Sequence, residues 1–450
     1  MQAGATKGCV AALRCLAAAG VVATLMFGLN PAHAQKASTF WLAGGEAADT
    51  KSEDWTAGAH LRSLYLDRGP PSSGSDFAAW TLGGWLYAQS PYFFDVMSFG
   101  ATGYGSFPLW RGPNPGQTDM LQPDGDSLAN LGEAFARLQY AGQGITLYRQ
   151  LINPRYPVAA GVRGNRLDLA FIGTRDIRSV PLTYEAAMAS GTVSDSLRYF
   201  AGYVWNVKPI DENGFESMSS LAGASGTDDG MWLGGVQWSP VTDLWLQGWY
   251  HNVRNTLAIS FVDADYVNRP SKEWYWRVGT QYAYQSSTGT DQLTGSEFST
   301  WNWGAYGEVG WKYLKWYAAY STTGDGANIS TPYSKGPLYI TQRIKDFTRA
   351  GEQAWLIGGT IDFSSFGLTG LSFDINAAID SNAGTNPGTG AANPKWTEYD
   401  YDLIYRFGKE TWFDGMRVRL RYAQWDQDNG ATTTRTNDFR VDLNWTYSFK

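Results

Sequence analysis

Apolar and polar residues alternate with a period of two along much of this chain. In residues 417–425, RVRLRYAQW, the arginines Arg417, Arg419 and Arg421 are separated by single apolar residues. Successive side chains of a β-strand point to opposite faces, so this pattern predicts a strand with three guanidiniums on one face and apolar groups on the other. The apolar face would contact either a soluble core or the hydrocarbon of a membrane.

The end of the chain shows the same pattern more completely. Residues 440–450, RVDLNWTYSFK, place every apolar residue on one face, namely Val441, Leu443, Trp445, Tyr447 and Phe449. A last strand of this kind, with a Phe at or beside the final position, is typical of bacterial outer-membrane barrels. We therefore expect the barrel-assembly machinery to be a partner of this chain through its C-terminal strand.

The recurring period predicts an all-β fold, a transmembrane antiparallel up-and-down β-barrel of about 18 strands. Sixteen is the alternative, because the segments 144–150 and 256–263 are the weakest. Short connections such as 239–243 alternate with long ones such as 323–353, which is typical of short periplasmic turns and long external loops. The expected strands are 57–67, 78–89, 93–104, 132–141, 144–150, 181–190, 196–206, 230–239, 243–252, 256–263, 273–285, 301–311, 313–322, 354–363, 370–380, 396–407, 415–425 and 437–449.

The N-terminal segment, residues 1–34, has the features of a secretory signal peptide: two basic residues, an apolar run from Cys15 to Leu29 and a small-residue site ending at Ala34. Both cysteines lie in it, so the expected barrel domain, residues 35–450, has no disulfide and no cysteine-ligated metal. Of the 35 basic residues, Lys7 and Arg14 also lie in it, which leaves 33 against 42 acidic residues, a net charge of −9. This balance argues against nucleic acid as a partner.

Composition also favours a barrel. Past residue 34 no apolar run approaches the ~20 residues that a membrane-spanning helix requires. The chain contains 21 Trp, 26 Tyr, 21 Phe and 52 Gly, with only 17% charged residues. Aromatic girdles at the two membrane interfaces, small residues and polar loops would produce this profile, and outer-membrane lipid would then surround the barrel.

The arginine row has a definite place in such a barrel. Arg417, Arg419 and Arg421 would project into the lumen about 7 Å apart, because the opposite phase would cost about 2–4 kcal/mol for each arginine in hydrocarbon. Antiparallel pairing would set Asp402 near Arg421 and bring Asp442 close from the last strand. The charges would then either brace the wall by ion pairing or leave an excess of positive charge for solutes, to which Arg406 would add.

The expected third external loop, residues 151–180, is rich in arginine. Loops of this length in barrels often fold inward and narrow the pore, and a ring of cationic side chains selects for anions. A solvated surface loop is the alternative. The arginines are Arg155, Arg163, Arg166, Arg175 and Arg178, against only Asp168 and Asp176.

Catalytic and metal sites have little support in the sequence. Barrel hydrolases use a Ser nucleophile with a His base, but only His60 and His251 follow residue 34 and no Gly-x-Ser-x-Gly occurs. The stretch DQDNG at 426–430 differs from a calcium loop, because its glycine comes at the fifth position and no Glu follows at the twelfth. We expect neither an enzyme nor a metal or other cofactor.

Four stretches resemble the OprD-type substrate-specific outer-membrane porins, which are 18-stranded barrels of Gram-negative bacteria. They are residues 61–69, 153–173 and 343–373 and the C-terminal strand. The resemblance implies that the third loop folds into the channel and that wall arginines guide substrates bearing a carboxylate. By this resemblance, the candidates for the constriction are Arg155, Arg163 and Arg166. The candidates for guiding the substrate along the wall are Arg417, Arg419 and Arg421.

The expected function is passive, substrate-selective diffusion of small solutes that bear a carboxylate, through an arginine-lined channel in the bacterial outer membrane. A polymer-export barrel of the alginate-porin type, also arginine-lined, is the alternative. A barrel that does not conduct is the third hypothesis, and a conductance measurement separates it from the other two.

Overall fold

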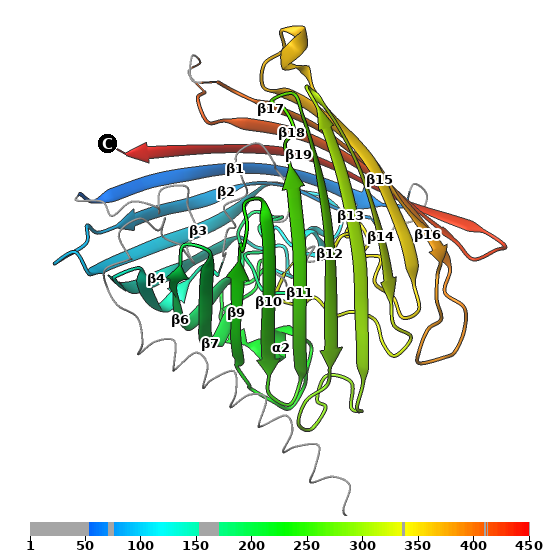
Figure 1. Ribbon diagram of the computed structural model, residues 1–450, viewed down its shortest axis with the longest axis horizontal. Helices are drawn as coiled ribbons and strands as arrows, with labels where there is room; N and C mark the ends of the chain where they lie inside the picture. Colours follow the sequence, from blue (N-terminus) through cyan, green and yellow to red (C-terminus); the bar gives the residue numbers. More distant parts are fainter. Residues whose placement is uncertain are drawn as a thin grey trace, which may run out of the picture.

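The structure, a computed structural model, describes residues 54–70, 76–152, 171–334, 338–408, 411 and 413–449. Eighteen long strands form one sheet in which neighbours pair antiparallel, and the pairing of the first strand with the last closes it into a barrel. Figure 1 shows the last strand lying beside the first. The predicted fold class is therefore confirmed, whereas the expected signal peptide lies outside the described residues.

The elements follow one another around the barrel in chain order. A two-residue strand, β8 (Glu216–Ser217), pairs only with β7, so β7 and β9 are neighbours in the wall. Among the described residues, three short helices lie in connections: η2 (Pro115–Thr118), α2 (Met218–Leu221) and η3 (Phe363–Phe366). The wall strands are β1 (Thr56–Gly69), β2 (Phe77–Gln89), β3 (Met97–Arg111), β4 (Leu128–Tyr140), β5 (Gln143–Gln150), β6 (Thr183–Ser194), β7 (Leu197–Lys208), β9 (Met231–Trp238), β10 (Leu244–Val253), β11 (Leu257–Asn268), β12 (Trp274–Ser286), β13 (Ser299–Trp311), β14 (Leu314–Thr323), β15 (Gln353–Asp362), β16 (Leu371–Asn382), β17 (Lys395–Arg406), β18 (Arg417–Asp428) and β19 (Thr433–Phe449).

All eighteen expected strands correspond to wall strands, including the two weakest, so the sixteen-strand alternative is wrong. The clearest error is in the third strand, which was expected at 93–104 but spans Met97–Arg111. Phe94 and Asp95 have φ angles of 54° and 59°, and Phe93 forms an isolated bridge with Met97. These residues therefore form a tight turn before the strand, because a left-handed backbone cannot continue an extended chain.

The two faces of the wall differ as the period predicts. On β19, Tyr447 and Phe449 are exposed on the outside, whereas Asp438 and Arg440 are buried on the inside. The connections also differ between the two ends of the barrel. At the short-turn end, β4 and β5 are joined by only two residues, and the start of β1 and the end of β19 lie at this same end. At the long-loop end, residues 151–182 join β5 to β6, and residues 324–352 join β14 to β15.

The inside of the barrel is partly filled. The largest cluster of buried apolar residues combines the inner faces of β6–β12 with residues of the long loops, such as Phe171 and Tyr333. The Tyr184 hydroxyl on β6 donates a hydrogen bond to the carbonyl oxygen of Gly173 at 2.6 Å, and the Tyr333 hydroxyl donates one to that of Met218 at 2.6 Å. Within the described residues, no helix is long and apolar enough to cross a membrane.

Candidate functional site

The arginine row on β18 faces the inside of the barrel. Leu420, between Arg419 and Arg421, and Tyr422, directly after Arg421, point outward and are 40% and 37% exposed. The side chains of Arg419 and Arg421 are only 16% and 17% exposed. The predicted phase of this strand is therefore confirmed, and the apolar residues lie on the outer face.

Asp402 on β17 lies at the centre of three guanidiniums, two of which belong to this row. Its carboxylate oxygens are 2.5 Å from Arg419 Nη2 and 3.0 Å from Arg421 Nε. A third guanidinium, from Arg343, lies 3.0 Å from Asp402 Oδ1 and 3.8 Å from Asp400 Oδ2. The predicted juxtaposition of Asp402 with Arg421 is confirmed by the strand register, and Asp442 on β19 lies opposite Arg419.

Arg343 belongs to the long loop 324–352, which reaches the wall at β16 and β17. The Glu398 carboxylate on β17 accepts hydrogen bonds from the backbone N–H groups of Ile344 and Lys345 at 2.6 and 2.9 Å. Arg349 pairs with Glu352 at 2.5 Å and also with Asp380 on β16. The loop is therefore fixed to the inner wall by buried ionisable groups, and this fixes Arg343 against Asp402.

A second group of charges lies on β1 and β19. Arg62 on β1 pairs with Asp176 at 2.5 Å and donates to the carbonyl oxygen of Arg178 at 2.5 Å. Arg68 and Arg440 share Asp438, with Nε to carboxylate distances of 2.6 and 2.7 Å. Asp176 and Arg178 are loop residues, so the described end of the loop 151–182 contacts the same stretch of wall.

Burial and neighbouring charges act on the two loop residues in different ways. Burial raises the pKa of the Asp176 carboxyl, but the attraction of Arg62 outweighs it, so the pKa is lowered from its usual value. Burial lowers the pKa of the Arg178 guanidinium, and the nearby Arg440 lowers it further, to about 9. Both groups therefore carry their charges at neutral pH.

Together these residues form what we term the arginine–aspartate wall, on β1, β17, β18 and β19 and the loops against them. The group as defined has eight guanidiniums and six carboxylates, an excess of two positive charges among its members. The members are Arg62, Arg68, Arg178, Arg343, Arg417, Arg419, Arg421 and Arg440, and Asp119, Asp176, Asp400, Asp402, Asp438 and Asp442.

The other arginines that the sequence predicts for the pore differ in their location and exposure. Arg417 is half-buried near the short-turn end, and its Nε atom has no hydrogen-bond partner in the described part of the chain. Arg406 lies opposite Arg417 in the β17–β18 register, but its side chain is exposed at the end of the strand. The constriction candidates Arg155, Arg163 and Arg166 lie outside the described residues.

The sequence pattern does not mark four arginines of the wall as site residues: Arg62, Arg68, Arg343 and Arg440. On β1 the inner face also includes the buried Leu64 and Leu66, so no alternation marks its arginines. Arg343 lies in a loop, where the period of two gives no signal. The segments 61–69 and 343–373, which carry the family resemblance, contain Arg62, Arg68 and Arg343, so the resemblance is the sequence signal for these three residues.

No group of three or more His, Cys, Asp or Glu side chains suited to a metal ion occurs among the residues that the structure describes.

Comparison with known proteins gives a consistent result. The sequence model of the OprD family, described as outer membrane porin, matches residues 52–449. No curated protein sequence matches the chain.

Several solved structures have the same fold. Pseudomonas aeruginosa OpdK with vanillate superposes with a TM-score of 0.74 at 17% identity, covering 89% of this chain and 100% of that one. P. aeruginosa OccK9 (OpdG) gives 0.73 at 18% identity, covering 88% and 99%. Acinetobacter baumannii OccAB1 gives 0.76 at 16% identity, covering 90% and 100%.

The family match spans nearly the whole barrel, and it favours an uptake porin over the polymer-export alternative. Proteins of this family are passive channels of the Gram-negative outer membrane rather than enzymes. The chain belongs to the OprD family of outer-membrane porins.

Proposed function

We propose that this porin passes small solutes that carry a carboxylate, by passive diffusion along the arginine–aspartate wall. The observation that supports this most is the sharing of Asp402 by three guanidiniums. Asp400 and Asp442 also lie beside these cations, so with Arg417 four guanidiniums meet three carboxylates, and one positive charge is left over at a partly exposed surface. A solute carboxylate can accept paired hydrogen bonds from such guanidiniums.

A ligand bound to one of the similar structures agrees with this chemistry. OpdK of P. aeruginosa was solved with vanillate, which is an aromatic carboxylate. We propose a solute of the same chemical class for this chain, since the excess of positive charge on its wall suits an anion.

Mutual bracing of the wall charges is the competing interpretation. It accounts well for Arg440, which is 3% exposed and bound to Asp438 through two nitrogen atoms. It accounts less well for Arg417, whose Nε atom has no partner in the described residues. We therefore assign bracing to the buried arginines and solute guidance to Arg417, Arg419 and Arg421, with Arg406 at the short-turn end.

We also propose that the third external loop, expected at residues 151–180 and part of the β5–β6 connection, narrows the pore. Its described end supports this, because Asp176 contacts Arg62 inside the barrel and the Gly173 N–H donates to the Tyr333 carbonyl oxygen at 2.9 Å. The constriction role then belongs to Arg155, Arg163 and Arg166. Replacing Arg155 and Arg166 by Glu should weaken anion preference, and an unaltered reversal potential would place the loop outside the constriction.

The guiding role is tested by solute flux into liposomes that contain the folded protein. The variant Arg417→Ala/Arg419→Ala/Arg421→Ala should take up vanillate roughly tenfold more slowly, because electrostatic focusing of the anion is lost. Uptake of vanillyl alcohol, which lacks the carboxylate, should change little.

Arg435→Ala is the matched control. Arg435 lies on the adjacent strand β19 and pairs with Asp426 at 2.7 Å, with a side chain that is 50% exposed. Its loss should leave both fluxes unchanged. Equal vanillate uptake by the triple variant and the wild type, with the barrel folded, would refute the guiding role.

A further inference from the structure

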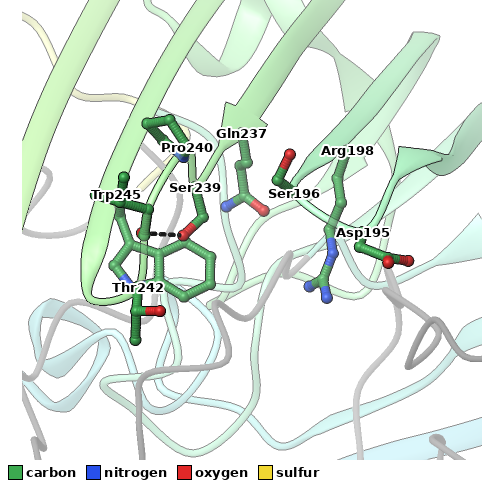
Figure 2. Close-up of a pocket in the computed structure, with 9 residues that line it drawn as sticks. Asp195, Ser196, Arg198, Gln237, Ser239, Pro240, Thr242 and Trp245 are labelled. Atoms are coloured by element: carbon green, nitrogen blue, oxygen red, sulfur yellow. Dashed lines mark hydrogen bonds between the residues drawn. The ribbon is translucent and has the colours of Figure 1, made fainter.

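A cavity lies at the short-turn end of the barrel, far from the arginine–aspartate wall. It has a volume of ≈ 390 Å³ and is lined by the turns between β6 and β7 and between β9 and β10, together with Arg198, Gln237 and Trp245. Figure 2 shows these side chains and the two turns around them. In the closed ring of strands, β9 lies nine strands from β18 in either direction, so the cavity is on the opposite wall.

The cavity is on the inner side of that wall. Val236 and Trp238, on either side of Gln237 in β9, are exposed on the outside, whereas Gln237 is 3% exposed. Arg198 and Trp245 alternate in the same phase as Phe200 and Trp249, which are buried inside. The Ser239 N–H donates to the Ser196 carbonyl oxygen at 2.8 Å and holds the two turns together. The cavity therefore opens at the periplasmic mouth of the channel.

The Gln237 amide is the unusual group in this cavity. Neither its Nε2 nor its Oε1 atom has a hydrogen-bond partner among the described residues. A buried polar group without a partner is costly, and most such groups in folded proteins bind water or a ligand. Here the Gln237 side chain lines a cavity large enough for a small organic molecule.

The residues beside Gln237 on the adjacent strands explain why its amide has no partner. Gln237 lies directly opposite Gln247 on β10 in the strand register. The Gln247 amide donates to Asp263 at 3.0 Å and accepts from the Trp249 indole at 3.2 Å, so both of its ends are engaged. On the other side Gln237 lies opposite Arg198 on β7. An amide and a guanidinium therefore adjoin each other in one register row, with the Trp245 indole in the same cavity.

We propose that this cavity is a second solute-binding subsite, at which a flat organic anion with a hydroxyl group binds on leaving the channel. Its carboxylate accepts from the Arg198 guanidinium, its hydroxyl pairs with the Gln237 amide, and its ring packs on Trp245. The proposal rests on the proposed function for the charge of the solute, but the residues are separate from the arginine–aspartate wall.

The test uses 4-hydroxybenzoate and benzoate as probes, with binding measured by saturation-transfer NMR on detergent-folded protein. The protein carries Arg417→Ala/Arg419→Ala/Arg421→Ala, so that binding at the opposite wall does not contribute. We expect 4-hydroxybenzoate to bind more tightly than benzoate. In addition, Gln237→Leu should remove this preference, and Arg198→Gln should weaken binding of both probes roughly tenfold, as for a lost charged hydrogen bond.

The control is Lys312→Gln, which removes one exposed cation from another short turn, where it pairs with Glu273 at 3.6 Å. It should leave both affinities unchanged. Gln237→Met provides a second test in case the leucine variant folds poorly, and it should also lose the preference. Equal affinities for the two probes in the parent protein, or a preference that persists in the Gln237 variants, would overturn the subsite. If only the vanillate flux test failed, guidance by the arginine–aspartate wall would be refuted, but the binding evidence for the subsite at Gln237 would be unaffected.

Discussion

Asp402 is the residue on which the charge of the arginine–aspartate wall depends most. Its carboxylate contacts Arg343, Arg419 and Arg421, and the side chain is 12% exposed. A carboxylate among several cations stabilises their positions, because guanidiniums that are not paired repel one another and lose solvation on burial. The same carboxylate reduces the potential that an anion meets in the lumen. Asp402 therefore balances the rigidity of the wall against its attraction for anions.

Replacing Asp402 by Asn should raise anion preference and lower stability. Three guanidiniums would lose their shared negative charge, and the free energy of unfolding should fall by about 3 kcal/mol, as when a buried pair loses one partner. Reversal potentials under a salt gradient and denaturant titrations of the folded barrel measure the two effects. Asp426→Asn, which breaks an exposed pair with Arg435, should change the stability much less, because solvent screens an exposed ion pair. A shift of Asp402→Asn toward cation preference would be incompatible with this role of the carboxylate.

At the level of elements, the loop 324–352 is the part of the chain that brings a cation to the wall from outside the sheet. Its attachment rests on the Arg349 interactions with Glu352 and Asp380 and on the Glu398 contacts with the loop backbone. Burial and the adjacent Asp380 raise the pKa of Glu352 and Arg349 opposes them, and together they bring it to about 8. Protonation of Glu352 therefore favours the attached loop.

This pKa predicts a pH dependence of loop attachment. The pKa of Glu352 in the folded protein is above its ordinary value of 4.5. The contribution of Glu352 to the free energy of loop attachment is therefore complete below about pH 4.5 and is lost as the pH rises toward about 8. Conductance fluctuations of single channels should increase over this range. Glu352→Gln, which keeps the side chain neutral, should reduce this increase, whereas Glu212→Gln in an exposed loop should not. An undiminished pH dependence in Glu352→Gln would exclude this carboxyl as its origin.

The sequence predicts the strands well and the loops poorly, for a physical reason. A strand at a membrane or core boundary alternates its side chains, so even the weak segment 256–263 corresponds to a real strand, β11. The long loops have no such local constraint, and contacts such as Arg62 with Asp176, 114 residues apart, depend on the path of the whole loop. The row Arg417, Arg419 and Arg421 and its pairing with Asp402 could be predicted because adjacent strands fix the register; Arg343 could not.

At the level of the whole molecule, the lumen has two unlike sides. The strands β6–β12 and the loops beside them form an apolar cluster, while β1 and β17–β19 present the arginine–aspartate wall. An ion crossing the barrel meets a group of eight guanidiniums on one side. Although the complete chain has more acidic than basic residues, the local excess at the wall decides which ions pass, since charges separated by more than about 10 Å in 0.1 M salt are largely screened.

The reversal potential of single channels in a planar bilayer under a salt gradient shows whether this wall sets the selectivity of the pore. We expect discrete openings with anion preference, and a smaller preference in Arg417→Ala/Arg419→Ala/Arg421→Ala, because the row supplies much of the positive potential in the pore. Cation preference of the wild-type channel would mean that the acidic residues dominate the lumen, and the arginine–aspartate wall would then not be the selective element.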